Sequence, residues 1–422
     1  MRVLIVGGGG REHALAWRLA PEADRVYCAP GNAGIASVAE CVPIASDDIA
    51  SLVSFAREKE VDLVVVGPEA PLVAGLADRL EAAAVPVFGP RGDGARLEGS
   101  KVWARDLCDR YGIAQPWSRS FTEVQEALEF VRSYEGPYVV KADGLAAGKG
   151  VTVTPDLAEA ESALRASLSE RIFGEAGSRV LVEECMSGPE ISSLALTDGH
   201  LVLPLALAQD HKRIGDGDTG PNTGGMGAYS PVPFVDDVLR EQIAADVLVP
   251  TVRALEAEGI DYRGLVYAGL MLTGEGPKVL EFNCRFGDPE TQALMPRIAS
   301  GLLGALMASA KGSLSDADIV WHPGSCLTVT LTSNGYPGEY RTGLPIGGLD
   351  AASEIEGVTV FHSGTTMRDD RVVTAGGRVL SVSAMADTLE EARTKAYEAC
   401  SRISFDGMHY RRDIAAMGVS ID

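Results

Sequence analysis

Two lysines and a run of glycines occur together in residues 141–151, which read Lys-Ala-Asp-Gly-Leu-Ala-Ala-Gly-Lys-Gly-Val. Such a loop can fold over a polyphosphate, because backbone N–H groups and a lysine side chain would face the negative oxygens. The loop is not of the Walker A type. Asp143 stands where the first glycine of that motif belongs, and Gly150 replaces the Ser or Thr that contacts magnesium. A plain hairpin turn is the alternative, but such a turn gains nothing from two flanking lysines.

Residues 279–290 offer oxygen ligands on a predicted strand. Side chains two positions apart on a strand share a face, so Glu281 and Asn283 are predicted to point together as hard ligands suited to Mg²⁺. Arg285 continues on that face, and its planar guanidinium suits bidentate binding of a carboxylate or phosphate. A solvated strand face is the alternative for this pattern taken alone.

A glycine-rich turn, Gly7 to Gly10, joins the first predicted strand to the first predicted helix. Glycines let the backbone approach an anion, and a helix N-terminus offers free N–H groups. A nicotinamide-binding fold is one alternative. Against it, Glu12 replaces the third glycine of that fingerprint, and the second strand ends at Pro30 without the acidic residue that would bind a ribose. A tight turn with no ligand is the other alternative.

The elements that must position these groups alternate in the first ~100 residues. Strands are predicted at 2–7, 25–30, 62–67 and 85–89, and helices near 12–20, 48–59, 71–84 and 93–111. Alternating strands and helices predict a doubly wound parallel sheet, with ligand-binding loops at the carboxyl ends of the strands.

The remaining chain predicts two further α+β regions. Strands at 138–142, 151–154 and 179–184 around an amphipathic stretch at 156–171 resemble a small inserted lid, and the glycine-rich residues 210–231 predict a long loop. Strands at 325–331, 358–362 and 378–384 with a helix near 388–402 predict a last unit. The predicted domains are 1–100 (Rossmann-like), 101–312 (with the lid at about 119–190) and 325–422 (α+β).

Bulk composition excludes several classes of protein. A chain of 422 residues is too long for one core, and its net charge of −22 argues against nucleic acid as a partner. No secretory leader or membrane-spanning stretch is expected, so the cytoplasm is the expected compartment. Seven scattered cysteines predict reduced thiols rather than disulfides or a zinc site.

Taken in order, Gly99-Ser100-Lys101, the 141–151 loop, residues 183–190 and Glu281-Phe282-Asn283 resemble the ATP-grasp superfamily. Longer motifs resemble, within it, the phosphoribosylamine–glycine ligase family, and the similarity covers the whole chain. They are GGREHA (9–14), APGNAG (29–34), VGPEAPL (66–72), KADGLAAGKGV (141–151), QDHKR (209–213), DTGPNTGGMGAYSP (218–231) and EFNCRFGDPETQ (281–292).

The resemblance implies an ATP-grasp fold for the central domain and a carbon–nitrogen ligase. Its reaction passes the γ-phosphoryl of ATP to glycine, and the amine of 5-phosphoribosylamine then attacks the glycyl phosphate. Mg²⁺ or Mn²⁺ is the implied cofactor and ATP the co-substrate. The implied partners are small molecules only, with no membrane, and the implied state is a monomer or weak homo-oligomer.

The resemblance also implies roles for individual residues that lie in the matching motifs. Catalytic roles are implied for Arg285 and Lys149, and metal ligation for Glu281 and Asn283. ATP binding is implied for Lys101, Lys141, Gly144, Gly148, Lys149, Gly150, Glu183, Glu184, Met186 and Glu190. Phosphoribosylamine binding is implied for Gly9, Arg11, Glu12, Pro30, Asn32 and Glu69. Glycine and acyl-phosphate binding is implied for Asp210, Lys212, Asn222, Thr223, Arg285, Gly287 and Asp288.

Three alternatives stay open at this point. A sister ATP-grasp ligase on another purine precursor or carboxylate would share the same ATP site. A nucleotide-binding oxidoreductase would use the Gly7–Gly10 turn instead. A catalytically silent nucleotide-binding module would have little reason to retain Lys149, Glu281 and Asn283 together.

Overall fold

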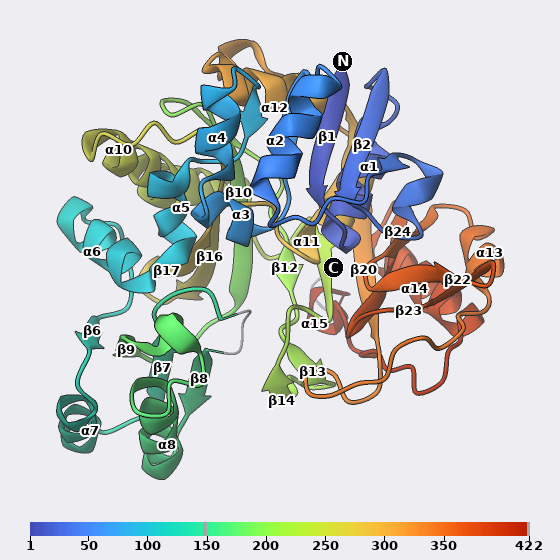
Figure 1. Cartoon of the computed structure of the whole chain (residues 1–422). Helices are drawn as coiled ribbons and strands as arrows, with labels where there is room; N and C mark the ends of the chain where they lie inside the picture. The colour runs from blue at the N-terminus through green and yellow to red at the C-terminus, as the bar shows by residue number, and fades with distance from the viewer. Residues whose placement is uncertain (147–149, 420–422) are drawn as a thin grey trace.

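The computed structural model of the chain describes residues 1–146 and 150–419. Its first ~100 residues form a five-stranded parallel sheet in the order β3-β2-β1-β4-β5, with helices on both faces (Figure 1). Residues Val3 to Val6 are fully buried, as the apolar run predicts. The elements are β1 (Arg2–Gly7), α1 (Gly10–Leu19), β2 (Arg25–Pro30), η1 (Ile35–Ser37), β3 (Glu40–Cys41), α2 (Ile49–Glu58), β4 (Leu63–Val66), α3 (Glu69–Val73), α4 (Leu76–Ala82), β5 (Val87–Phe88) and α5 (Gly92–Gly99).

The predicted doubly wound sheet is confirmed, and two predicted helices are each divided. The helix near 71–84 is α3 and α4, because Gly75 between them adopts a left-handed conformation with φ of +84°. The helix near 93–111 is α5 followed by α6 (Lys101–Tyr111). Ser100 is extended there, and its side chain caps α6 by accepting a hydrogen bond from the Trp103 N–H.

The lid is a small antiparallel sheet, β6-β9-β7-β8, covered by two helices at the lower left of Figure 1. It has its own core, which includes Phe121, Leu128, Val140, Leu164 and Val182. The elements are β6 (Ser118–Phe121), α7 (Val124–Ser133), β7 (Tyr138–Ala142), β8 (Val151–Thr154), α8 (Leu157–Leu168), η2 (Gly174–Gly177) and β9 (Val180–Glu184).

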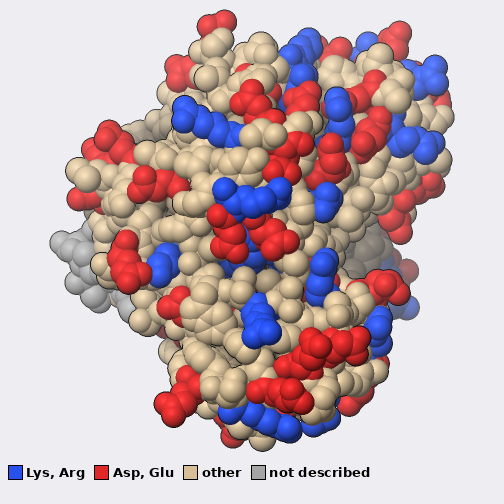
Figure 2. Space-filling model, turned by 90° about the vertical axis from the view of Figure 1, so that its left-hand side faces the viewer, with Lys and Arg blue, Asp and Glu red and all other residues tan. Residues whose placement is uncertain are grey.

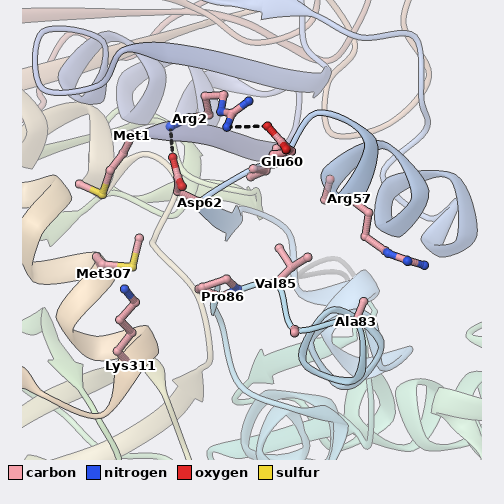
Figure 3. Close-up of a pocket in the computed structure, with 13 residues that line it drawn as sticks. Met1, Arg2, Arg57, Glu60, Asp62, Ala83, Val85, Pro86, Met307 and Lys311 are labelled. Carbon is pink, nitrogen blue, oxygen red and sulfur yellow. Dashed lines mark hydrogen bonds and ion pairs between the residues drawn. The ribbon is translucent and has the colours of Figure 1, made fainter.

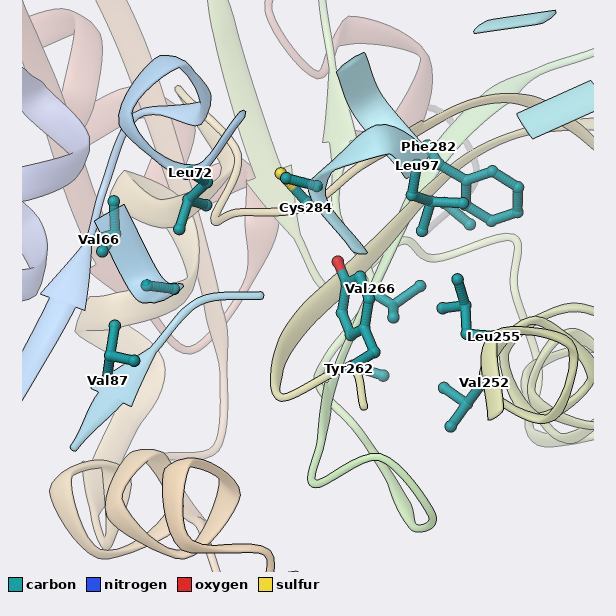
Figure 4. Close-up of a cluster of buried hydrophobic side chains, with 14 of the residues drawn as sticks. Val66, Leu72, Val87, Leu97, Val252, Leu255, Tyr262, Val266, Phe282 and Cys284 are labelled. Carbon is teal, nitrogen blue, oxygen red and sulfur yellow. The ribbon is translucent and has the colours of Figure 1, made fainter. Parts of the chain in front are cut away.

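A second antiparallel sheet, β11-β10-β16-β17, forms the body of the central region. Its core is continuous with that of the first domain: Val66 and Leu72 belong to the same cluster as Val266 and Phe282 (Figure 4). The elements are β10 (Glu190–Thr197), β11 (Val202–Pro204), α9 (Asp237–Ile243), η3 (Ala244–Leu248), α10 (Val249–Ala257), β16 (Gly264–Thr273), β17 (Gly276–Asn283), α11 (Glu290–Leu294), η4 (Met295–Arg297), β18 (Ile298–Ser300), α12 (Leu302–Lys311), η5 (Leu314–Asp316) and β19 (Val320–Trp321).

The prediction of a long loop over 210–231 is wrong. That segment contains β12 (Gln209–Asp210), β13 (Arg213–Gly215), β14 (Thr219–Asn222) and β15 (Gly227–Ser230). β13 and β14 form a hairpin, whereas β12 and β15 join the sheet of the C-terminal domain. All four residues of β15 are buried because this strand pairs with β20 nearly a hundred residues later, a contact that local composition cannot reveal.

The C-terminal domain is built on the sheet β12-β15-β20-β24-β21, against which α14 packs. The predicted strands and helix are present there. The elements are β20 (Ser325–Thr332), α13 (Leu349–Ser353), β21 (Val358–His362), β22 (Thr365–Arg368), β23 (Arg371–Thr374), β24 (Arg378–Ala386), α14 (Leu389–Arg402) and α15 (Ala416–Val419). Among the described residues, no helix is long and apolar enough to cross a membrane. On the face shown in Figure 2, acidic and basic side chains are interspersed.

Candidate active site

The last residues of β17 bring two oxygen-bearing side chains to one face. Glu281 and Asn283 stand opposite Gly269 and Tyr267 of the antiparallel strand β16. Gly269 leaves room for this arrangement, because a side chain there would begin 3.2 Å from the Cγ atom of Glu281 and would push it aside. The predicted pairing of Glu281 and Asn283 on one strand face is therefore present.

These two side chains fit a divalent metal that is shared with phosphates. Carboxylate and amide oxygens are hard ligands, and Mg²⁺ is usually held by one or two protein groups, with water and phosphate oxygens completing its shell. Within residues 1–146 and 150–419 no cluster of three or more His, Cys, Asp or Glu side chains is arranged around a cation site. With one carboxylate and one amide, Glu281 and Asn283 suit a metal that takes its other ligands from phosphate and water.

Four cations surround Glu281. Burial raises its pKa, but the charges of Lys212, Lys141, Lys101 and Arg285 outweigh burial and hold the pKa below its ordinary value. These four residues come from β12–β13, β7, α6 and the end of β17, so the fold gathers them from distant parts of the chain. A site with a carboxylate among cations is suited to polyphosphate with its metal.

Lys141 is buried in an ion-pair cluster. Its Nζ lies 2.7 Å from Glu183 Oε2 and donates to the carbonyl oxygen of Leu280 at 2.9 Å. Arg105 of α6 holds the other side of Glu183, with its Nε 2.7 Å from Oε1 and its Nη2 3.0 Å from Oε2. The carboxylate of Glu183 thus anchors Lys141 between the lid and β17, and both its oxygens are engaged within the protein.

Burial lowers the pKa of Lys141, while Glu183 opposes this effect. For Glu183, burial raises the pKa, but Lys141 and Arg105 outweigh it and lower the pKa to about 2. Glu184 and Met186 follow at the half-buried end of β9.

The start of the predicted phosphate loop is tied to α6. Lys101 Nζ donates to the carbonyl oxygen of Gly144 at 2.9 Å, and the N–H of Val102 donates to Asp143 Oδ1 at 3.1 Å. Arg179 also binds Asp143, with its Nε 2.8 Å from Oδ2. Gly148 and Lys149 lie outside the described residues. Gly150 is closely packed, since an added Cβ would come within 2.7 Å of the Ala146 Cβ.

Lys212 lies among several carboxylates. Its Nζ is 2.9 Å from Glu190 Oε2 and 3.6 Å from Glu281 Oε1. Burial lowers the pKa of Lys212, but Asp210, Glu190 and Glu281 outweigh burial and hold the pKa well above its ordinary value. Burial raises the pKa of Asp210 to about 7. The positive charge of Lys212 opposes this rise, and the carboxylate of Glu290 adds to it.

Two further predicted residues are positioned around this lysine. Thr223 folds back on Lys212, since its N–H and its hydroxyl each donate to the Lys212 carbonyl oxygen at 2.8 Å. Asn222 lies opposite Arg213 in the hairpin.

Arg285 lies between carboxylates from two elements of the first ~100 residues. Its Nη2 donates to Glu98 Oε1 at 3.0 Å and to Asn283 Oδ1 at 3.1 Å, and its Nε lies 3.4 Å from Glu69 Oε2. Burial lowers the pKa of Arg285, but Glu98 and Glu69 outweigh it, so the net pKa is raised and the guanidinium stays charged.

The first-domain loops reach the same place. Glu12 accepts from the Gly9 N–H at 2.6 Å and from Arg11 Nε at 2.5 Å, while Arg11 Nη1 donates to the Phe286 carbonyl oxygen at 3.2 Å. Gly7, at φ +123°, is required because a Cβ there would lie 2.6 Å from Glu12. Gly287 also lacks room for a side chain, because a Cβ there would lie 2.4 Å from Glu290 Oε2.

Asn32 is fully engaged within the protein. Its Nδ2 donates to the carbonyl oxygens of Gly8 at 2.9 Å and His362 at 2.7 Å, and its Oδ1 accepts from the N–H groups of Gly34 and Ile35, both at 2.9 Å. This side chain therefore fixes the loop after Pro30 against the C-terminal domain.

Sequence reasoning missed several residues that organise the site. Glu98, Arg105 and Arg378 are the clearest cases. Arg378 Nη1 donates to the carbonyl oxygen of Asp288 at 2.8 Å and lies 3.2 Å from its Oδ1. Arg378 also donates to the Gly224 carbonyl oxygen and so connects β24 to the 209–230 segment. Glu98 directly precedes the Gly99-Ser100-Lys101 motif, but nothing in the local sequence indicates its role, and the long-range contacts of all three residues identify them.

A separate hollow of about 680 Å³ lies at the opposite edge of the first sheet (Figure 3). Its lining includes Arg2, Asp62 and Pro86, which stand before or at the start of β1, β4 and β5, together with Lys311 of α12. The candidate site residues lie at the carboxyl ends of these strands, so this hollow is not part of the site.

Comparison with known proteins assigns the whole chain. Three models of phosphoribosylglycinamide synthetase match it: the N domain at 1–98, the ATP-grasp (A) domain at 99–291 and the C domain at 326–417. A Vibrio cholerae protein named phosphoribosylamine--glycine ligase is 49% identical over 100% of this chain and 99% of its own length. A Pseudomonas aeruginosa protein of that name is 48% identical over 100% and 99%.

Solved structures agree with this assignment. The crystal structure of phosphoribosylamine--glycine ligase from Thermotoga maritima superposes with a TM-score of 0.85 at 34% identity, covering 98% of this chain and 100% of that one. The biotin carboxylase domain of Hydrogenobacter thermophilus 2-oxoglutarate carboxylase, at 14% identity and a TM-score of 0.74 over 100% and 98% of the two chains, shares the fold. The chain therefore belongs to the phosphoribosylglycinamide synthetase family, whose three domains it carries in order.

Proposed function

We propose that the chain catalyses the ATP-dependent ligation of glycine to 5-phosphoribosylamine, with glycyl phosphate as the intermediate and glycinamide ribonucleotide, ADP and phosphate as products. The observation that carries the proposal is the 49% identity, over the full length, to a protein named phosphoribosylamine--glycine ligase. The reaction is a step of purine biosynthesis. The geometry supports it, because carboxylate and cationic side chains from all three matched regions converge on the end of β17.

The ATP site is proposed at the junction of the lid and β17. Lys101 and Lys141 contact the phosphates, the loop containing Gly144, Gly148, Lys149 and Gly150 covers them, Glu183 to Met186 border the adenine and Glu190 meets the ribose. Glu281 and Asn283 hold Mg²⁺ or Mn²⁺. When bound, this cation offsets charge on the γ-phosphoryl group as it is transferred.

The glycine site is proposed between the end of β17 and the 209–230 segment. Arg285 orients the glycine carboxylate, one oxygen of which attacks the γ-phosphorus, so that a P–O bond forms to glycine as the bond to ADP breaks. Arg285 and Lys149 stabilise the charge on the transferred group, while Lys212, Asn222, Thr223, Gly287, Asp288 and Asp210 line the site. Groups held in place lower the barrier by removing the cost of bringing the reactants together.

Phosphoribosylamine is proposed to bind on the first-domain loops through Gly9, Arg11, Glu12, Pro30, Asn32 and Glu69. Its amine nitrogen attacks the acyl carbon, the C–O bond to phosphate breaks, and the nitrogen loses a proton. We assign substrate binding to residues 1–100 and ATP binding to residues 101–312, and propose residues 325–422 as a further domain. The expected setting is the cytoplasm, and the expected state is a monomer or weak homo-oligomer acting on small molecules.

Phosphate release by the purified protein with MgATP tests the proposal, with glycine and phosphoribosylamine omitted in turn. Phosphoribosylamine is generated in situ from ribose 5-phosphate and ammonia, and the product is identified by mass spectrometry. Release that needs both substrates and yields glycinamide ribonucleotide is expected. Release with another carboxylate in place of glycine would instead assign the chain to a sister ATP-grasp ligase.

A further inference from the structure

The carboxylate of Glu98 contacts the two residues that follow Asn283. Glu98 lies in α5 and is only 9% exposed. Its Oε1 accepts from Arg285 Nη2 at 3.0 Å, and its Oε2 accepts from the N–H of Cys284 at 2.9 Å and from the Cys284 thiol at 3.3 Å. Both oxygens are therefore occupied by donors from the segment immediately after β17.

Glu69 also faces Arg285, but more loosely. Its Oε2 is 3.4 Å from Arg285 Nε, and its side chain is 28% exposed, compared with 8% for Glu98. Glu69 is the first residue of α3, among the loops proposed to bind phosphoribosylamine. A ligand can reach Glu69 but not Glu98, so the two carboxylates are expected to act differently on the same arginine.

Arg285 in turn contacts a proposed metal ligand. The nitrogen that binds Glu98, Nη2, also donates to Asn283 Oδ1 at 3.1 Å. A guanidinium that lost its buried counter-ion would carry unbalanced charge beside this oxygen and beside Glu281. It would then compete with a cation for those oxygens.

We propose that Glu98 is a positioning residue that holds the guanidinium of Arg285 beside the proposed oxygen ligands of β17. In this position Glu98 maintains the metal affinity of the site. It also maintains the alignment of Arg285 with the acyl phosphate. The effect on the alignment of Arg285 rests on the proposed function, whereas the effect on metal affinity requires only a nucleotide–metal site. Glu98 acts through Arg285 and touches neither substrate nor metal. Groups in this kind of outer contact commonly change metal affinity or activity by about 10- to 100-fold.

The substitution Glu98→Gln tests the proposal, because glutamine keeps the size of the side chain and can accept from the Cys284 N–H but carries no charge. Mn²⁺ binding in the presence of ADP is measured by the electron paramagnetic resonance signal of free Mn²⁺. The dissociation constant of Mn²⁺ is expected to rise and kcat to fall, each by about 10-fold or more, while KM for phosphoribosylamine stays close to that of the wild type.

Two matched variants separate positioning from other effects. Glu69→Gln removes one charge from the same arginine and is expected to raise KM for phosphoribosylamine without changing Mn²⁺ binding. Asp198→Asn alters another buried carboxylate, 4% exposed, which accepts from the N–H groups of Leu201 and Leu314 beyond the far end of β10. It is expected to lower stability with wild-type Mn²⁺ binding.

A double-mutant cycle shows whether Glu98 acts through Arg285. In an Arg285→Gln background, Glu98→Gln is expected to add little to the loss of kcat, because coupled residues are not additive. Losses of kcat that add up in the double variant would overturn the proposal. Wild-type Mn²⁺ binding and wild-type kcat in Glu98→Gln would also overturn it.

A shorter acidic side chain keeps the proposal testable if Glu98→Gln does not fold. Glu98→Asp retains the charge and is expected to bind Mn²⁺ normally with a lower kcat, because the guanidinium moves toward the shorter side chain. Normal kcat in that variant would contradict the proposal. A wild-type protein that released phosphate without glycine would instead disprove the proposed reaction and leave the Mn²⁺ comparison intact.

Discussion

At the scale of single residues, charge rather than shape distinguishes this site from the rest of the molecule. The chain carries a net charge of −22, yet Lys101, Lys141, Lys212 and Arg285 all face Glu281. A surface with that charge repels an anion, so polyphosphate binding requires such a local excess of cations. Lys141, Lys212 and Arg285 each also form an ion pair with a protein carboxylate, which keeps the site stable before a ligand arrives.

Glu281→Ala is expected to lower metal-dependent phosphate release more than about 100-fold, because a direct ligand matters at least as much as an outer contact. The fold should persist, since Lys212 retains Glu190 as an ion-pair partner. Activity and circular dichroism spectra are compared with those of Glu275→Ala, a change at the exposed turn between β16 and β17. Full activity in the Glu281 variant would overturn the metal assignment.

Glu183→Gln tests the buried cluster that positions Lys141. The pKa of Glu183 falls from 4.5 to about 2. Its stabilising effect is therefore complete above pH 4.5 and is lost as the pH falls through 2. The variant is expected to be less stable by about 3 kcal/mol at pH 7, with a difference that shrinks below pH 4.5.

Urea unfolding from pH 7 to pH 3 measures this difference. The control is Glu161→Gln, which removes an ion pair with Arg132 on the surface and is expected to have a much smaller effect. A difference for Glu183→Gln that does not change with pH would show that the carboxylate is not held ionised by its neighbours.

At the scale of elements, α1 and β21 form a contact between the first and last domains that depends on neutral histidines. His13 Nδ1 accepts from the N–H of His362 at 2.8 Å. Burial, with His362, lowers the pKa of His13 to about 3, and burial lowers the pKa of His362 to about 4. Between these values and 6.5 the unfolded chain binds more protons than the folded one, so stability falls as the pH drops below 6.5.

His13→Asn is expected to reduce this pH dependence, because the asparagine oxygen can accept the same hydrogen bond without titrating. At pH 5 the wild type should have lost about 2 kcal/mol through His13 alone. Urea midpoints at pH 7.5 and pH 5 measure the effect, with His200→Asn, a change at an exposed histidine paired with Glu256, as the control. Equal slopes for His13→Asn and the wild type would contradict this account.

The parts of the fold that the sequence predicts are those governed by local periodicity. The alternation of strands and helices in the first domain and the shared face of Glu281 and Asn283 both follow from residue spacing. The contact of Arg285 with Glu98, 187 residues earlier, does not follow from residue spacing. The strand β15 is not predicted for the same reason: Gly224, Gly225 and Gly227 at and before its start are typical of loops, and only pairing with β20 makes it a buried strand.

At the scale of the whole molecule, nucleotide and metal are expected to stabilise the protein together. The proposed metal ligands on β17 are only two, so the remaining ones are expected to be phosphate oxygens and water. MnCl₂ alone should leave the melting temperature almost unchanged. Mn²⁺ with ADP at 100 times its dissociation constant should add about 2.7 kcal/mol and raise the melting temperature.

Differential scanning fluorimetry with ADP, Mn²⁺ and both together tests this expectation. The control variant is Glu281→Ala, in which the combined effect should fall to that of ADP alone. An equal shift with Mn²⁺ alone would indicate a metal site that does not need the nucleotide.

The sheet shared by β12, β15 and the C-terminal domain also constrains how the protein is made. During synthesis β15 leaves the ribosome roughly a hundred residues before β20, its pairing partner, has been translated. At roughly 5–20 residues per second, β15 waits for several seconds with only β12 beside it and its other edge unpaired. β20, at the start of the last quarter of the chain, must therefore emerge before the middle can finish folding. A ribosome that stalls near residue 320 would release an aggregation-prone intermediate rather than a functional two-domain fragment.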